Sequence, residues 1–222
     1  MKDVTIVIPA KFESESLPKV LDELKKIPVK IIVVLPKYDI LTLNSVKRYN
    51  CKIVFQKKNG YGSAISQGIF SVKTKYFCIF NADGACDPKY LKKMRSIIIR
   101  GSDFVFNTRY AKKGGSDDDT ILTYIGNKIF TLICNVLFQL NISDVLFTYV
   151  MGHTKAFKSL KLKSRDFTFC VELPIKAKFM QYKITSMPSY ERARIAGKKK
   201  VSEFKDGFLI LISIIRLFIF KK

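Results

Sequence analysis

The stretch Lys75-Tyr76-Phe77-Cys78-Ile79-Phe80 is an apolar run of strand length, and it leads directly into Asn81-Ala82-Asp83-Gly84-Ala85-Cys86-Asp87-Pro88. In an open α/β sheet, ligands bind in the crevice outside the carboxyl ends of the strands. Carboxylate and amide oxygens at such a place suit a hard divalent cation, which prefers oxygen ligands and phosphate partners. The same residue types also favour turns and helix starts. The segment therefore predicts either a metal–phosphate site or a capped turn.

The residues around this segment alternate between strand-like and helix-like patterns. Up to residue 110, we expect strands over 4–8, 29–35, 51–55, 75–80 and 103–107, and helices over 17–27, 60–72 and 88–99. The remainder predicts a loop over 112–119, helices over 121–140 and 170–179, and a strand over 183–187. Asp117, Asp118 and Asp119 are expected to cap the 121–140 helix. This order predicts an α/β fold with a mainly parallel sheet that is flanked by helices.

Composition limits the class of protein. A formal net charge of +22 over 222 residues points to a polyanionic partner, which is nucleic acid, an anionic membrane surface or a phosphorylated substrate. The five cysteines are scattered without C-x-x-C spacing, which indicates reduced thiols and argues against a zinc site or a disulfide framework. His153 is the only histidine, so a His-based metal site or catalytic triad is not expected.

The C-terminal segment is almost wholly apolar over 208–220 and is followed by Lys221 and Lys222. As a helix this segment would be roughly 20 Å long, which is shorter than the hydrocarbon core of a bilayer, about 30 Å. We therefore expect one α/β domain over 1–202 and a membrane-associating interfacial helix over 203–222. The alternative is a C-terminal helix that packs on the domain. The 121–140 helix contains polar residues and is not expected to span a membrane.

Further motifs accompany the metal segment along the chain. They are Pro9-Ala10-Lys11-Phe12-Glu13, Gly60-Tyr61-Gly62-Ser63-Ala64, Asn107-Thr108-Arg109-Tyr110, Phe169-Cys170-Val171-Glu172-Leu173, and Tyr190-Glu191-Arg192-Ala193-Arg194-Ile195-Ala196-Gly197-Lys198-Lys199-Lys200. In this order they resemble the family 2 glycosyltransferases of the GT-A fold. The resemblance is greatest to the branch that includes dolichyl-phosphate mannose synthases and bacterial polyprenyl-phosphate sugar transferases. It spans nearly the whole chain, and the order of the motifs is more specific than any single motif.

The resemblance implies a GT-A (Rossmann-like) enzyme that transfers a sugar from a UDP- or GDP-sugar with inversion. The implied catalytic residues are Asp83, Arg109, Glu172 and Arg192. The implied donor-binding residues are Pro9, Ala10, Glu13, Asp39, Gly62, Asn81, Ala82, Asp83, Arg194 and Lys200. The implied ligands of Mg²⁺ or Mn²⁺ are Asn81, Asp83 and Asp87. The glycines are expected to serve tight turning and close packing near the donor more than direct phosphate contact.

The sequence departs from the family pattern at three places. Asn81 replaces the first aspartate of the metal segment. Residues 35–39 replace the paired acidic residues that hold the nucleoside, so that Asp39 is the available substitute. Residues 144–149 replace the usual S-G-F element of the acceptor loop. The nucleotide base, the sugar, the acceptor and the oligomeric state therefore stay open.

The acceptor can be argued from acid–base chemistry. A polyprenyl phosphate is already ionised near neutral pH, because the second pKa of a phosphate monoester is about 6. Transfer to it needs cationic positioning more than a base, and Glu172 would then orient another residue. A saccharide acceptor would instead require a base, for which Asp144 or Glu172 is available. A further alternative is a degenerate relative that binds nucleotide or lipid without chemistry.

These features together predict the partners and the location of the protein. The expected partners are a nucleotide-sugar, a polyprenyl phosphate and an anionic membrane surface. We expect a peripheral protein on the cytoplasmic face of the membrane. Nucleic acid is not an expected partner, because the chain has no recognisable nucleic-acid-binding module and ends in an apolar segment.

Overall fold

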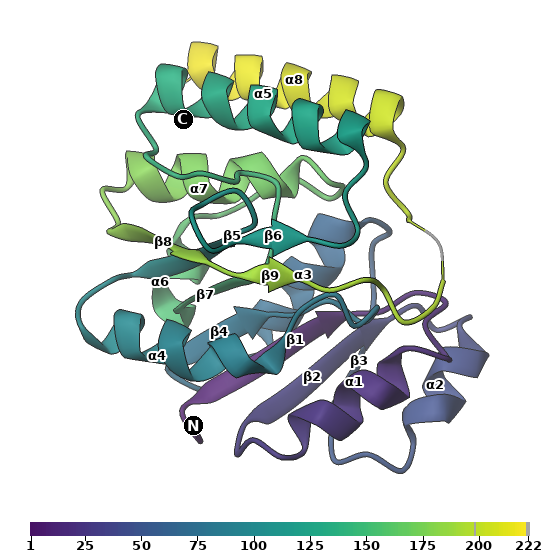
Figure 1. Cartoon of the computed structure of the whole chain (residues 1–222). Coiled ribbons are helices and arrows are strands. Elements are labelled where there is room, and N and C mark those ends of the chain that lie inside the picture. The colour runs from purple at the N-terminus through teal and green to yellow at the C-terminus, as the bar shows by residue number, and fades with distance from the viewer. Residues whose placement is uncertain (198, 221–222) are drawn as a thin grey trace.

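A computed structural model describes residues 1–197 and 199–220 of the chain. Its larger sheet has the strand order β3-β2-β1-β4-β7-β5-β8 (Figure 1). These strands are β1 (Val4–Pro9), β2 (Lys30–Leu35), β3 (Lys52–Phe55), β4 (Tyr76–Ile79), β5 (Phe104–Thr108), β7 (Val150–His153) and β8 (Ile184–Pro188). Neighbouring strands pair in parallel except at β7, which is antiparallel to both β4 and β5. The expected mainly parallel α/β sheet is therefore confirmed.

Helices cover both faces of the sheet (Figure 1). They are α1 (Leu17–Leu24), α2 (Ile40–Val46), α3 (Tyr61–Phe70), α4 (Leu91–Ile99), α5 (Ile121–Phe138), α6 (Thr154–Ser159), α7 (Phe169–Phe179) and α8 (Glu203–Phe220), with a 3-10 turn at Pro88–Tyr90. Alternate residues of β1 face opposite layers, as the period of a strand requires. Ile6 and Ile8 join the core with α1 and α4, whereas Val7 joins the core with α3, α6 and α7.

The strand β7 and the helices α2 and α6 were not predicted from the sequence. β7 enters the sheet between β4 and β5. Each of these two strands is parallel to its other neighbour, β1 and β8 respectively. Gly152 makes this insertion possible, because a Cβ at this position would lie 2.5 Å from the Phe104 ring. A four-residue strand whose partners are far away in the chain leaves little local periodicity to recognise.

A second, two-stranded sheet joins the segment that we expected to be a loop to the basic C-terminal segment. β6 (Gly115–Ser116) pairs in parallel with β9 (Tyr190–Glu191). This pairing brings Asp118 next to Arg194 and Lys199. The expected capping of α5 by the three aspartates is wrong, because Thr120 and Thr123 form a capping box at that helix start.

The helices α5 and α8 lie side by side as an outer layer over α7 (Figure 1). Ile210 and Ile214 of α8 are buried in a cluster with Cys134 and Phe138 of α5. Much of the opposite surface of the two helices is apolar and exposed. Its exposed apolar residues are Ile121, Leu122, Tyr124, Ile125, Ile129, Leu132 and Val136 on α5, and Phe204, Phe208, Ile215, Phe218, Ile219 and Phe220 on α8. Among the described helices, α5 is long and apolar enough to cross a membrane, by length and composition alone.

Candidate active site

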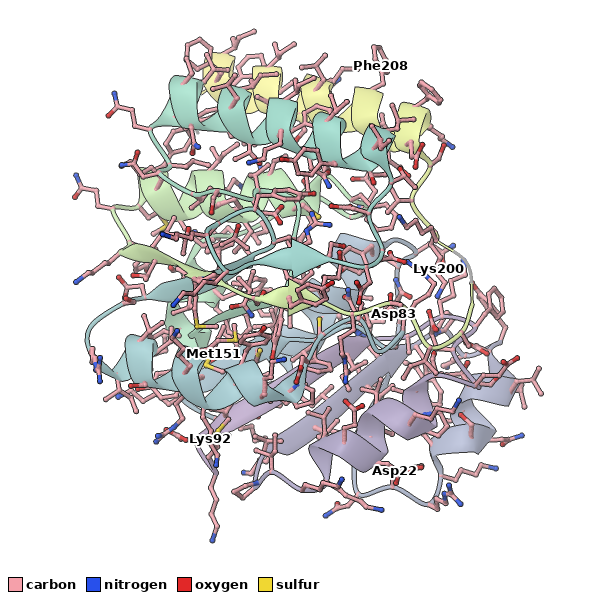
Figure 2. All side chains as sticks on the ribbon, in the orientation of Figure 1. Asp22, Asp83, Lys92, Met151, Lys200 and Phe208 are labelled. Carbon is pink, nitrogen blue, oxygen red and sulfur yellow. The ribbon has the colours of Figure 1, made fainter. Side chains whose placement is uncertain are left out.

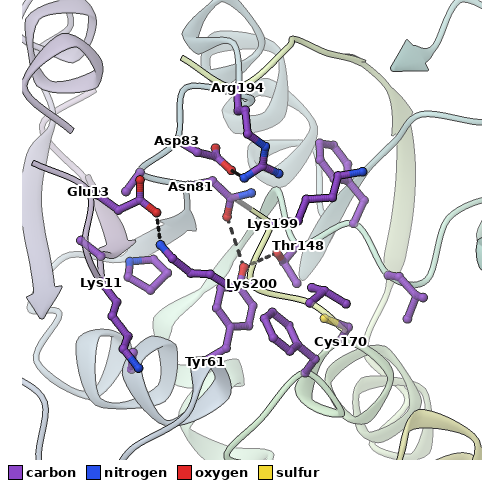
Figure 3. A pocket seen from close by; sticks show the side chains of 18 of the residues that line it. Lys11, Glu13, Tyr61, Asn81, Asp83, Thr148, Cys170, Arg194, Lys199 and Lys200 are labelled. Atoms are coloured by element: carbon purple, nitrogen blue, oxygen red, sulfur yellow. Dashed lines mark hydrogen bonds and ion pairs between the residues drawn. The ribbon is translucent and has the colours of Figure 1, made fainter. Parts of the chain in front are cut away.

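A cavity of about 640 Å³ opens at the carboxyl ends of β1 and β4. Figure 3 shows it from close by, with side chains from distant parts of the chain pointing toward a common centre. The predicted site residues that line it are Pro9, Ala10, Glu13, Asn81, Ala82, Asp83, Arg109, Arg194 and Lys200. The predicted site residues that do not line it are Asp39, Gly62, Asp87, Glu172 and Arg192.

Asp83 lies in the turn that follows β4, at the wall of this cavity. Its Oδ1 accepts a hydrogen bond from the backbone N–H of Ala85 at 3.1 Å, and its Oδ2 lies 3.8 Å from the guanidinium of Arg194. Burial raises the pKa of the Asp83 carboxyl above its usual value, and the nearby carboxylates of Glu13 and Asp118 raise it further against the opposing effect of Arg194. Asp83 therefore has both carboxylates and a cation as neighbours in the cavity.

Asn81 accepts a hydrogen bond from Tyr61, which Thr148 positions in turn. The hydroxyl of Tyr61 donates to Asn81 Oδ1 at 3.2 Å and also lies 2.5 Å from Thr148 Oγ1 (Figure 3). Burial raises the pKa of Tyr61 well above its usual value, so the hydroxyl stays a donor. Tyr61 also stacks on Phe167, with ring centroids 4.9 Å apart. Its position inside the glycine motif is the sequence signal that could have identified it.

The segment after β9 covers the cavity with cations that are paired to carboxylates. Arg194 binds both oxygens of Asp118, at 3.1 and 2.8 Å. Lys200 forms an ion pair with Glu13 (Figure 3). Lys199 lies 3.6 Å from Asp118. Lys198, in the same basic run, lies outside the described residues. An anionic ligand in the cavity would therefore compete with Glu13 and Asp118 for these cations.

Arg109 lines the cavity, but its guanidinium forms a buried network of ion pairs. Its guanidinium binds both oxygens of Asp144, at 2.7 and 3.1 Å, and it also contacts Asp119 at 3.3 Å and Glu191 at 3.2 Å. Three carboxylates thus surround one cation. This arrangement does not favour the expected catalytic role of Arg109, because three carboxylates already bind its guanidinium. Asp144 is likewise unsuited as a base, since Arg109 occupies both of its oxygens.

Arg192 and Asp87 brace the Asp83 turn from outside the cavity. Arg192 donates to the carbonyl oxygens of Gly84 and Cys86, at 3.0 and 2.8 Å, and pairs with Glu23. Asp87 accepts from the backbone N–H of Lys89 at 2.9 Å and caps the 3-10 turn. The structure therefore gives Arg192 a supporting position instead of a catalytic one, and it separates Asp87 from the expected metal ligands.

Asp39 and Gly62 also serve the architecture of the site. Asp39 caps α2 by accepting from Thr42 N, and its other oxygen accepts from Phe12 N at 2.6 Å. It therefore holds the loop that carries Phe12, instead of facing a nucleoside. Gly62 allows close packing, because a Cβ there would lie 2.7 Å from Ser164 O. The expected packing role of this glycine is confirmed.

Glu172 faces a different part of the molecule. Its carboxylate accepts hydrogen bonds from the backbone N–H groups of Lys163 and Ser164, and it pairs with Lys176 at 2.8 Å. Burial alone would raise the pKa of Glu172, but these hydrogen bonds outweigh burial and lower it. Glu172 does not line the active-site cavity. Neither its expected role of orienting an arginine there nor its alternative role as a base is therefore supported.

The oxygen atoms of the Asp83 turn suit a divalent cation. Asp83 and Asn81 offer a carboxylate and an amide oxygen. Burial is the main cause of the raised pKa of Asp83, and the carboxylates of Glu13 and Asp118, which add to it, would favour a cation. No three His, Cys, Asp or Glu side chains within residues 1–197 and 199–220 group as a metal site. Mg²⁺ is commonly held by one or two carboxylates together with substrate phosphates and water, so a partial protein shell fits such an ion.

The fold and the cavity define an α/β protein that binds its ligand at the strand ends. The model of the glycosyl transferase family 2 matches residues 5–161, so the chain belongs to glycosyl transferase family 2. An uncharacterized glycosyltransferase of Mycobacterium tuberculosis is 26% identical over 211 residues, which is 94% of each chain. A dolichyl-phosphate hexose transferase of Haloferax volcanii is 24% identical over 221 residues, covering 97% of this chain and 93% of the relative.

Solved structures support the fold. Glucosyl-3-phosphoglycerate synthase from Mycobacterium tuberculosis, in complex with Mn²⁺, UDP-glucose and phosphoglyceric acid, superimposes with a TM-score of 0.78 at 13% identity. The match covers 97% of this chain and 79% of that one. The expected GT-A fold is therefore confirmed, and the chain is a family 2 glycosyltransferase.

Proposed function

We propose that this glycosyltransferase moves a sugar from a UDP- or GDP-sugar to a polyprenyl phosphate at a membrane surface, with inversion and with Mg²⁺ or Mn²⁺. The observation that carries the proposal is the composition of one wall of the cavity. Thr123 and Asn127 of α5 and Ile210 of α8 contribute to that wall. The same two helices expose a broad apolar surface to the outside. A lipid lying along this surface would bring its phosphate to a cavity that is rich in cations.

The donor would lie between the N-terminal loop and the basic segment. Phe12 and Tyr38 line the cavity as exposed aromatic rings with centroids 6.2 Å apart, and they offer apolar surface to a nucleobase. Arg194 and Lys200 would transfer from Asp118 and Glu13 to the pyrophosphate oxygens, because phosphate groups bear more charge than one carboxylate. Arginine is suited to bidentate phosphate binding.

The residues of the site stabilise the leaving group more readily than they activate an acceptor. Breaking the anomeric C–O bond places negative charge on the nucleoside diphosphate, where Arg194, Lys199 and Lys200 can neutralise it. A bound divalent ion, held by Asp83 and Asn81, would supply further neutralisation of that charge. An ionised lipid phosphate attacks without losing a proton, so no general base is required.

The names of the relatives agree with a phosphorylated acceptor. One relative is named for dolichyl phosphate, and the solved neighbour is named for phosphoglycerate. The apolar surface of α5 and α8 favours the lipid over a small soluble acceptor. It is also the reason for proposing a peripheral location on the cytoplasmic face, with anionic lipids as a partner.

A saccharide acceptor is the second candidate, because one cavity carboxylate is suited to be a base. Burial raises the pKa of Glu191, which lines the cavity and contacts Arg109 and Ser116. A raised carboxylate pKa suits general-base catalysis near neutral pH. If the acceptor is a sugar hydroxyl, Glu191→Gln should abolish transfer while leaving donor binding intact. If the acceptor is a lipid phosphate, the same change should leave turnover largely unchanged.

The direct test is sugar transfer into an organic-extractable product. The purified protein is incubated with a short polyprenyl phosphate, Mg²⁺ or Mn²⁺, and a panel of radiolabelled UDP- and GDP-sugars. Parallel reactions contain 3-phosphoglycerate or simple saccharides as acceptors. We expect a metal-dependent glycolipid that is absent in Asp83→Ala. Product with a soluble acceptor alone would overturn the lipid assignment, and nucleotide binding without any product would indicate a non-catalytic relative.

A further inference from the structure

A second cavity, of about 320 Å³, lies between α7, α8 and the segment that precedes α7. Its lining residues are Lys163, Ser164, Glu172, Lys176, Ser213, Arg216, Leu217 and Phe220. None of these residues lines the active-site cavity. The proposed sugar transfer therefore leaves this second cavity without a role.

The charges in the second cavity favour an anion. Lys163, Lys176 and Arg216 carry three positive charges against the single carboxylate of Glu172, which leaves a net charge of +2. Glu172 is saturated by Lys176 and by backbone N–H groups, so its oxygens are already occupied. Within the described part of the chain, the Lys163 ammonium and the Arg216 guanidinium contact no carboxylate and make no hydrogen bond. Two cations are thus available to a ligand.

The apolar residues of the second cavity indicate what the anion is attached to. Leu217 and Phe220 share its wall with the hydroxyl groups of Ser164 and Ser213. Phe220 is 65% exposed, and Ile219 next to it is equally exposed, so the cavity borders the apolar outer surface of α8. A ligand that places a phosphate against Lys163 and Arg216 would have its remaining part beside this apolar surface.

We infer that the second cavity binds the phosphate headgroup of an anionic membrane lipid. Arginine and lysine bind phosphate as a fork and as a point charge respectively, and basic residues beside an apolar helix favour anionic lipid surfaces. Such a headgroup would fix how the molecule sits on the bilayer and so keep the α5–α8 wall of the active site against the lipid. The inference rests on the membrane-surface part of the proposed function and adds a lipid site outside the donor cavity.

The test compares vesicle binding of full-length variants. Sedimentation is measured with phosphatidylcholine vesicles that contain or lack phosphatidylglycerol, at fixed ionic strength. Lys163→Gln and Arg216→Gln should each weaken binding to the phosphatidylglycerol vesicles about fivefold, and the double variant about 25-fold. The matched control is Lys92→Gln with Lys93→Gln on α4. Figure 2 shows Lys92 at the opposite end of the molecule from Phe208 of α8. The control should change binding by less than about twofold, because exposed charges are screened beyond about 8 Å.

Three results would overturn the inference. An equal loss in the control pair would mean that net charge alone drives binding. Unchanged binding in the double variant would mean that the second cavity does not contact lipid. Calorimetric binding of inorganic phosphate that depends on Lys163 and Arg216, without any effect on vesicles, would identify a soluble-ion site instead.

A parallel assay separates this inference from the proposed function. Sugar transfer to a short-chain, water-soluble polyprenyl phosphate without vesicles should be the same in the double variant and the unmodified protein. If the unmodified protein transfers no sugar, the proposed function fails, whereas the vesicle measurement still tests the second cavity. If the double variant loses transfer to the soluble acceptor, the second cavity belongs to catalysis and the lipid-anchoring inference is wrong.

Discussion

Asp83 and Asp87 lie four residues apart in one turn, yet their side chains have different surroundings. Asp83 lines the active-site cavity, whereas Asp87 caps the 3-10 turn. We predict that Asp83→Asn lowers the rate of sugar transfer at least about 100-fold, as expected for the loss of one preorganised electrostatic group. Asp87→Asn should change the rate of sugar transfer by less than about threefold, because the partners of Asp87 lie outside the cavity. Initial rates at saturating metal measure both, and a larger loss in Asp87→Asn would restore it as a metal ligand.

The pKa of Asp83 predicts how metal binding depends on pH. Only the ionised carboxylate binds a cation well, so affinity is present above the folded-state pKa and is lost as the pH falls through it. Because burial raises this pKa above 3.8, the loss should begin at a higher pH than for an ordinary aspartate. Arg194 opposes the increase, so Arg194→Met should move the loss to still higher pH. Titration of Mn²⁺ affinity against pH checks both directions, and a shift to lower pH in Arg194→Met would contradict the assignment.

At the scale of elements, the start of α3 depends on close contact with the segment before α7. A Cβ at Gly62 would lie 2.7 Å from both Phe169 Cβ and Ser164 O. We predict that Gly62→Ala lowers the free energy of unfolding by about 1–3 kcal/mol, as overpacking does. The matched control is Gly126→Ala in α5, where a Cβ meets nothing within 4 Å. That change should stabilise by about 0.5–1 kcal/mol, because alanine favours helix. Urea denaturation compares them, and equal effects would refute the packing argument.

The network around Arg109 joins β5, the start of α5 and β9. Arg109→Met leaves Asp144, Asp119 and Glu191 without their common cation, so we predict a loss of about 5 kcal/mol of stability. Asp144→Ala should cost less, about 3 kcal/mol, because two carboxylates still neutralise Arg109. Asp22→Asn, in an exposed pair with Lys25, is the control and should leave the unfolding midpoint unchanged. A smaller effect for Arg109→Met than for Asp144→Ala would contradict this charge balance.

At the scale of the whole molecule, α5 and α8 form a layer with one buried and one exposed surface. Phe204 and Phe208 are 82% and 65% exposed, whereas Ile214 is fully buried. We predict that Phe204→Ser with Phe208→Ser weakens vesicle binding at least about tenfold without a change in stability, since each buried Phe contributes about 1.5–3 kcal/mol. Ile214→Ala should instead lower stability by about 2–5 kcal/mol. Vesicle sedimentation and urea denaturation distinguish the two, and unaltered sedimentation of the double variant would exclude this surface as the membrane contact.

The sequence predicted the residues of the candidate site well where they lie in one turn or loop. It predicted them poorly where their partners are distant in the sequence. Asn81, Asp83 and Glu13 follow strand ends, and strand ends of a parallel sheet meet by geometry. Arg109 and Arg192 carry the expected charges, but their partners are carboxylates and carbonyl groups that only the folded chain brings together. Glu172 is likewise bound by the backbone N–H groups of residues 163 and 164 instead of facing the cavity. Tyr61 lies inside the glycine motif, but its hydrogen bond to Asn81, 20 positions further along the chain, is a contact that only the folded chain makes.

The sequence by itself determined the parallel strands, their order of appearance, the family and the Asp83 turn, because each depends on local hydrophobic periodicity or on a short motif. The tertiary structure decided the antiparallel insertion of β7, the pairing of β6 with β9, and the carboxylates that bind the buried Arg109. The strand pairings depend on contacts between residues 75 positions apart, such as those of Gly115 with Tyr190 and of Phe77 with Gly152. The buried ion pair of Arg109 with Glu191 joins residues 82 positions apart. The sequence pattern indicates which residues will be buried and which will need a counter-charge. Their partners are determined only when the layers of the fold pack together.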